Sequence, residues 1–154
     1  MSEVSRILDL LQRTFEGESW HGDPVMKVLA GVTAAQAAQK PLPSAHSIWE
    51  LVLHMATWKD VARLRLEHND HVPTDQENFP PVTETSPEAW QRAVERLVNA
   101  HRLLYAAVER MPEAKLNEEF PPNGKLSHYV RLHGVIHHDL YHAGQIALLK
   151  KGIA

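Results

Sequence analysis

The sequence predicts an all-α protein built as a bundle of four long helices. Four segments place apolar residues three and four positions apart, so that these residues share one face of an α-helix. Proline-rich breaks separate the segments, and no stretch is convincing as a β-strand. With 154 residues, of which 44% are apolar, the chain fits one domain over residues 1–154 with a single core.

The first long helix is expected over residues 2–16, and Gly17 ends it. Its apolar face comprises Val4, Ile7, Leu8, Leu11 and Phe15. The segment that follows is less regular. It contains a turn at 20–24 and a short helix that Pro24 opens and that reaches Leu29. The prolines at 41 and 43 end this region, because closely spaced prolines cannot continue a helix.

The second long helix has a marked start, since Ser47 and Glu50 match a capping box. It is expected to reach His68. One stripe along this helix comprises Leu51, His54, Trp58, Val61 and Ala62. His54 and Trp58 are therefore predicted to face the core, and a buried histidine needs a hydrogen bond or a metal for its nitrogens.

The third helix is predicted to start at Ser86 and Pro87, a serine cap followed by proline at the first helical position, and to end at Pro112. The last helix should run from Ser127 to Lys150, with Gly152 beyond it as a C-cap. The loops at 69–85 and 112–126 are long enough for functional lids. Two interpretations stay open for them, a cap at one end of the bundle and variable surface.

Composition excludes several classes of protein. The net charge is −3 and the basic residues are scattered, so no basic stripe for nucleic acid is present. No cysteine is present, which excludes disulfides, thiolate ligands and a cysteine nucleophile. The N-terminus lacks the pattern of a signal peptide, and no stretch approaches the roughly 20 apolar residues of a membrane span. A cytoplasmic protein that binds no membrane is the expectation.

Histidine is the residue type that points to function. Of 11 histidines, His138 and His142 stand four apart in the last helix, so both imidazoles lie on one face. If this helix faces the one that carries His54, three neutral nitrogens converge and leave part of a metal's coordination sphere open. The alternative is that these are core histidines satisfied by hydrogen bonds.

Other residues of the two helical faces carry weaker expectations. His101 is expected to be structural because no second ligand flanks it on its helix, and His133 and His137 to face solvent or an interface. Gly134 and Gly144 each cost helix stability, about 1 kcal/mol relative to alanine, so a close helix approach is expected there.

Two strings resemble a known family. Residues 45–56 (AHSIWELVLHMA) are similar to the second-helix signature of the DinB-like superfamily, and residues 138–146 (HDLYHAGQI) to its last-helix signature. The order of helices and loops also fits, so the resemblance covers nearly the whole chain. It implies a four-helix bundle with an up-down-down-up arrangement. It also implies one divalent metal held by His54, His138 and His142.

The same resemblance carries further expectations. Residues 20–22 (WHG) look like the loop that family members place near the metal cleft, and a homodimer through helix faces is plausible. Three histidines suit zinc, nickel, iron and copper, of which zinc, nickel and iron are the leading candidates. A metal so held can activate water or the thiol of a low-molecular-weight cofactor.

The leading hypothesis is therefore a metal-dependent enzyme, a thiol-dependent S-transferase or hydrolase acting on a small molecule. The alternatives are a non-catalytic metal-binding or stress-associated bundle and an interaction module. Asp139 and Glu50 are the acids nearest to the three histidines in sequence. Both are expected on the helix surface, with orientation of a histidine as the alternative role. Gln145 and Tyr141 are candidates for hydrogen bonds at the cleft or for packing.

Overall fold

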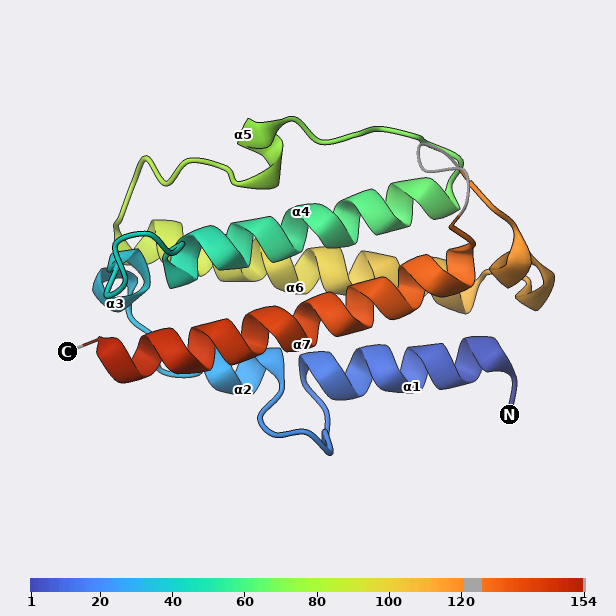
Figure 1. Cartoon of the computed structure of the whole chain (residues 1–154), viewed down its shortest axis with the longest axis horizontal. Helices are drawn as coiled ribbons and strands as arrows, with labels where there is room; N and C mark the ends of the chain where they lie inside the picture. Colours follow the sequence, from blue (N-terminus) through green and yellow to red (C-terminus); the bar gives the residue numbers. More distant parts are fainter. Residues whose placement is uncertain (121–125, 154) are drawn as a thin grey trace.

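Four long helices lie side by side in the computed structural model, which describes residues 1–120 and 126–153 (Figure 1). They are α1 (Glu3–Phe15), α4 (Ile48–Leu66), α6 (Pro87–Glu109) and α7 (His128–Gly152). Helices α1 and α7 run in one direction and α4 and α6 in the other, which is the up-down-down-up arrangement. Within the described residues the only extended pairing is an isolated bridge between Glu119 and Ser127. The all-α prediction is confirmed.

The connections contain short helices, which are α2 (Val25–Leu29), α3 (Ala34–Ala38), α5 (Asp75–Asn78) and the 3₁₀ helix η1 (Glu113–Asn117). Because α4 and α6 point the same way, the chain between them must return along the full length of the bundle. It does so beside α4, with α5 midway (Figure 1). The interpretation of the 69–85 loop as a cap at one end of the bundle is therefore wrong.

The predicted helix starts agree with the structure. Ser47 Oγ accepts from the backbone of Glu50, and the Glu50 carboxylate accepts from the backbone of Ser47. Ser86 caps α6, whose first residue is Pro87. Helix α3 was not predicted, although it also begins with a capping box, between Thr33 and Gln36.

Three glycines do not have the predicted roles. Helix α7 continues through Gly152 to a cap at Ile153, so Gly152 is not a C-cap. A Cβ at position 152 would lie 3.1 Å from Cβ of Pro41, so the absence of a side chain at Gly152 leaves room for this proline. At Gly134 and Gly144 a Cβ would meet nothing within 4 Å among the described residues, so the expected close helix approach is absent there.

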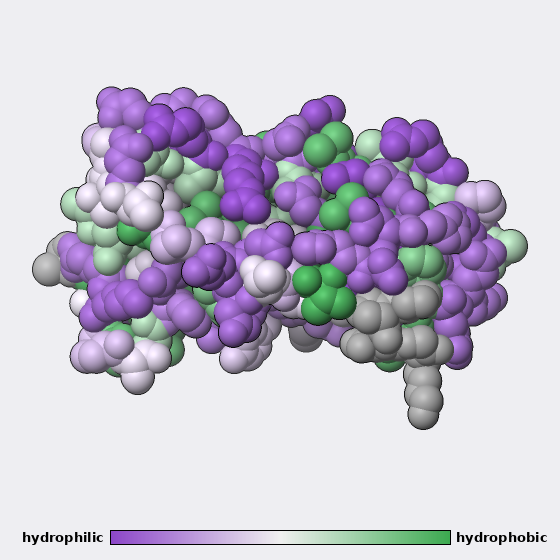
Figure 2. Space-filling model, turned by 90° about the horizontal axis from the view of Figure 1, so that it is seen from above, coloured by the Kyte–Doolittle hydropathy of each residue, from purple (hydrophilic) through white to green (hydrophobic). Residues whose placement is uncertain are grey.

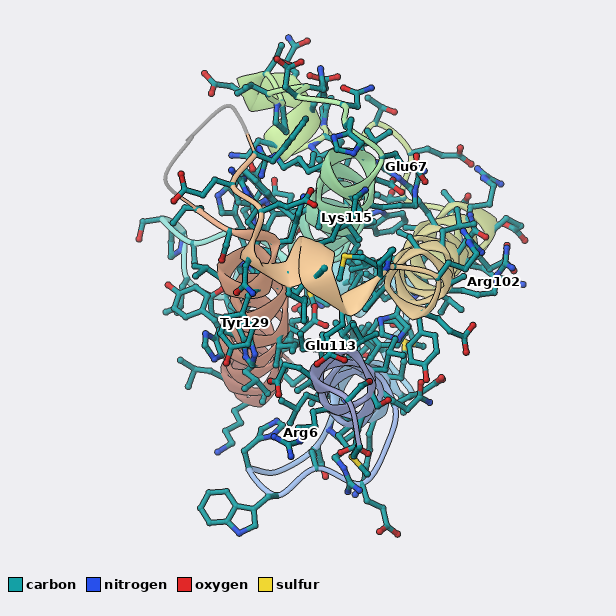
Figure 3. The ribbon with its side chains drawn as sticks, turned by 90° about the vertical axis from the view of Figure 1, so that its right-hand side faces the viewer. Arg6, Glu67, Arg102, Glu113, Lys115 and Tyr129 are labelled. Carbon is teal, nitrogen blue, oxygen red and sulfur yellow. The ribbon has the colours of Figure 1, made fainter. Side chains whose placement is uncertain are left out.

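The 3₁₀ helix η1 lies across the end of the bundle that faces the viewer in Figure 3. Glu113 points towards the start of α1 and accepts from the backbone of Glu3. Lys115 points towards the end of α4 and donates to the carbonyl of Leu66. An acid thus lies at a helix N-terminus and a cation at a helix C-terminus, which suits both helix dipoles. Here the 112–126 connection does cap the bundle, as far as Phe120.

The core has two hydrophobic parts with a polar layer between them. One part lies towards α2 and α3 and includes Trp49, Met55, Leu97 and Ile146. The other lies towards η1 and includes Ile7, Leu11, Leu104 and Leu132. The polar layer consists of three buried residues, Lys59 on α4, His101 on α6 and Asp139 on α7.

The face that carries the connection between α4 and α6 is mainly hydrophilic, with separate small hydrophobic areas (Figure 2). No continuous hydrophobic band crosses the part of this face that the described residues form. Among residues 1–120 and 126–153, no helix combines the length and apolarity needed to cross a bilayer.

Candidate metal centre

Helices α4 and α7 bring His54, His138 and His142 together. The Nε2 atom of His138 lies 2.9 Å from Nε2 of His54 and 3.0 Å from Nε2 of His142. One ligand nitrogen from each of the three residues falls within a group 4.8 Å across. His54 and His142 are buried and His138 is half-buried. The convergence expected from the spacing of these residues is therefore present in the fold.

The hydrogen bonds of the Nδ1 atoms determine which nitrogen of His54 and of His142 is free to face the other histidines. His54 Nδ1 lies 2.8 Å from the carbonyl oxygen of Asn78, and His142 Nδ1 lies 2.6 Å from Oε1 of Gln145. An oxygen acceptor at that position places the proton of a neutral imidazole on Nδ1. Each Nε2 of these two residues then carries a lone pair directed at the other histidines.

Hydrogen bonds alone cannot satisfy this arrangement. Nε2 of His138 carries at most one proton, which it can direct at His54 or at His142, so the other N···N contact of about 3 Å has no proton of its own. If the proton is on Nδ1 instead, the lone pairs of all three Nε2 atoms face one another. A cation removes this conflict, and nitrogens that share one ion at about 2.0–2.1 Å lie at such separations. The three residues thus fit a divalent metal better than they fit one another.

The protonation of the histidines points the same way. Burial lowers the pKa of His138 to about 3 and of His142 to about 4, and it also lowers the pKa of His54. All three rings are neutral near pH 7, which is the form that binds metals.

Side chains from the chain between α4 and α6 close over the group. Phe79 stacks on the ring of His54 with 4.1 Å between ring centroids. Asn78 accepts twice, from His54 through its carbonyl and from Trp58 Nε1 through its side chain at 2.8 Å. Trp58 is half-buried at the edge of the group, so its predicted place in the core is wrong.

Asn78 and Phe79 were missed from the sequence. The contact of Asn78 with His54 uses a backbone carbonyl, which any residue offers, so residue identity carries no signal for it. Phe79 is an isolated aromatic residue in a polar loop, and this was the one signal that could have singled it out.

Two cavities reach the group from different sides. One, of about 390 Å³, is mostly apolar and is bounded by His142, Phe79, Tyr141 and Gln145 among others. The other, of about 250 Å³, is bounded by His138, Trp58, Arg65 and Arg131 among others. A small molecule therefore has space beside two of the three imidazoles.

The four residues considered as neighbours of the three histidines differ in where the structure places their side chains. Gln145 accepts from His142, and Tyr141 is exposed with its ring 5.1 Å from that of His142. Glu50 binds Lys40 and His46, and within the described residues it makes no hydrogen bond or ion pair with the three histidines. Asp139 is not a surface acid, because it is fully buried and its Oδ2 lies 2.6 Å from Nζ of Lys59.

The remaining histidines lie outside the group. His101 is buried beside Lys59 and stacks on Phe15, as expected of a structural residue. His137 is exposed and His133 is half-buried. His21 and Gly22 line a cavity with residues of α2 and of another face of α7, so the expected place of this loop beside the three histidines is wrong.

A sequence model of the DinB superfamily matches residues 19–146. A comparison with curated proteins finds no match. Among solved structures, the fold is similar to the crystal structure of a conserved protein from Enterococcus faecalis, with a TM-score of 0.72 and 21% sequence identity. The similarity covers 99% of this chain and 98% of the other, and it concerns the fold.

Proposed function

The chain belongs to the DinB superfamily, and from this premise we propose that it is a metal-dependent enzyme. His54, His138 and His142 hold a divalent ion, with zinc, nickel and iron as the candidates. The reaction is a thiol-dependent S-transfer or a hydrolysis on a small molecule. The observation that carries this proposal is the meeting of three Nε2 atoms that hydrogen bonds alone cannot satisfy.

A divalent ion held by three neutral imidazoles acts as a Lewis acid on a thiol or water beside it. The chain's own residues supply orientation. The acceptors on Asn78 and Gln145 fix the rings of His54 and His142 and select their Nε2 atoms for binding. Phe79 covers one face of His54 and keeps water from it.

The cavities favour an enzyme over a non-catalytic metal-binding bundle. A site that only stabilises the fold is expected to be closed on all sides. Here about 390 Å³ of mostly apolar space adjoins His142, which suits the apolar part of a substrate.

The test is a screen for turnover with protein reconstituted with zinc, nickel or iron. Thiol transfer to a fluorogenic electrophile and hydrolysis of activated esters are measured for the wild type, His142→Ala and His137→Ala. The proposal predicts turnover that His142→Ala abolishes and that the exposed-site control His137→Ala retains. Metal-bound protein without turnover on either substrate class would favour the non-catalytic bundle.

A further inference from the structure

The cavity beside His138 has two arginines in its wall. Arg65 comes from the last turn of α4 and Arg131 from the first turn of α7, and both are half-buried. Trp58 and His138 line the same cavity of about 250 Å³. Two cations and an edge of the three-histidine group therefore share one space.

Neither arginine has an anionic partner among residues 1–120 and 126–153. The Arg65 side chain makes no hydrogen bond there, its Nε is buried without a partner, and its guanidinium lies 5.7 Å from the ring centre of Trp58. Arg131 donates to the carbonyls of Leu126 and Phe120, which hold the side chain without neutralising it. The segment at 121–125 has the sequence PPNGK, which contains no acidic side chain.

The two positive charges also act on each other. Burial lowers the pKa of Arg65, and the charge of Arg131 lowers it further. A guanidinium stays protonated in proteins, so the repulsion remains unless an anion relieves it. Charged groups removed from water are normally paired, and planar guanidinium groups bind carboxylate or phosphate through two parallel hydrogen bonds.

We propose that Arg65 and Arg131 bind the anionic end of the small molecule whose reactive end reaches the three histidines. This inference rests on the proposed function and adds the class of substrate or cofactor, a molecule with a carboxylate or phosphate group. Trp58 joins the two parts of the site, since its ring centre lies 5.7 Å from the Arg65 guanidinium and 6.4 Å from the His138 ring. The guanidinium of Arg65 therefore lies within about 12 Å of His138, which limits the length of the molecule.

The test uses pairs of thiols of equal length, in which one member carries a carboxylate and the other an uncharged alcohol. Cobalt(II)-loaded protein is titrated with 3-mercaptopropionate, 6-mercaptohexanoate and 8-mercaptooctanoate, and with the alcohols of matching length. Binding is followed by the sulfur-to-cobalt charge-transfer absorption. The proteins are the wild type, Arg65→Gln, Arg131→Gln and the control Arg63→Gln, which removes a cation paired with Glu67 on the same helix.

The proposal predicts that the best acid binds about tenfold or more tightly than its alcohol in the wild type. Arg65→Gln and Arg131→Gln should remove this preference and leave binding of the alcohol unchanged, while Arg63→Gln should keep it. Equal binding of acid and alcohol by the wild type would overturn the anion site and leave the metal and thiol proposal standing.

A second readout separates the two proposals. If none of the thiols binds cobalt, the thiol part of the proposed function fails, and metal-free protein titrated with hexanoate decides the anion site. A saturable shift of the Nε–Hε NMR signals of Arg65 and Arg131 supports the site, and the absence of such a shift overturns it.

Discussion

Two polar groups are buried between the same helices, less than one turn of α7 apart, and they are built in opposite ways. In the first, the charge of Lys59 meets that of Asp139, and His101 lies beside them against Phe15. In the second, three imidazoles direct nitrogen at nitrogen, and no acid lies among them. The first group balances its charge from within the chain, whereas the second has too few protons for its N···N contacts and fits the cation proposed here.

The comparison shows why burial of a histidine does not define its role. His101 and His138 are both removed from water, and the pKa of each is lowered to about 3. They differ in the groups that contact the ring. His101 meets the ammonium group of Lys59 and the aromatic face of Phe15, whereas His138 meets two further imidazoles. Partners, rather than burial, separate a structural histidine from a candidate ligand.

Breaking the Lys59–Asp139 group should have the largest effect on stability. Lys59→Met leaves a carboxylate buried without its partner, so the free energy of unfolding should fall by about 3–5 kcal/mol. The double variant Lys59→Met/Asp139→Leu should recover most of this loss, because it removes both charges. Urea unfolding of metal-free protein measures both values. Equal losses in the single and double variants would mean that the pair does not act through charge.

Metal addition should affect only the other group. A ligand that binds the folded state alone at about 100 times its Kd stabilises it by about 2.7 kcal/mol. Zinc should therefore raise the Tm of the wild type and of the double variant in the Lys59–Asp139 group. It should leave the Tm of His138→Ala nearly unchanged. A similar rise in all three proteins would show that zinc binds elsewhere.

The acceptor on His142 offers a smaller change within the metal group. Gln145→Leu removes the oxygen that fixes the ring of His142, so metal affinity should fall about 10–100-fold while the fold remains. Competition with a chromophoric chelator measures the affinity. The exposed Tyr141→Phe serves as a neighbouring control and should change little. An unchanged affinity in Gln145→Leu would remove the orienting role given to Gln145.

The smallest effect concerns pH and His101. Burial, and then the charge of Lys59, lower its pKa to about 3, below the ordinary value of about 6.5 that the unfolded chain retains. The unfolded state therefore binds the extra proton first. The stability from neutral His101 is complete above about pH 6.5 and is lost as the pH falls towards 3.

Removing the His101 imidazole should make the free energy of unfolding of metal-free protein depend less on pH. Between pH 6.5 and 5, His101→Leu should reduce the slope of the free energy of unfolding by up to about 1.4 kcal/mol per pH unit. Urea unfolding in the presence of a chelator provides the measurement. An unchanged slope would mean that His101 takes up a proton equally in both states.

Sequence patterns predicted the parts of this molecule that depend on local order. Ser47 with Glu50 and Ser86 with Pro87 mark helix starts through contacts within four residues, and the spacing of His138 and His142 follows from helix geometry. The orientation of Asp139 could not be predicted in this way. Its partner, Lys59, lies 80 residues away, and an acid in a helix is usually exposed.

The parts of the site that depend on distant contacts were not predictable either. Trp58 fits an apolar stripe by spacing, but its ring reaches the edge of the group because Asn78 accepts its N–H. Arg65 and Arg131 belong to different helices, and neither has a local pattern in the sequence that predicts an anion site. Only the packing of α4 against α7 brings them to one cavity with His138.

Metal binding by the three histidines is measured first as the metal content of untagged protein, by inductively coupled plasma mass spectrometry. Wild type, His54→Ala, His142→Ala and the exposed control His137→Ala are compared after reconstitution with zinc, nickel or iron. A three-histidine metal site predicts about one equivalent of metal in the wild type and the control, and almost none in the other two variants. A wild type that holds no metal after reconstitution would contradict it and return the three histidines to the core.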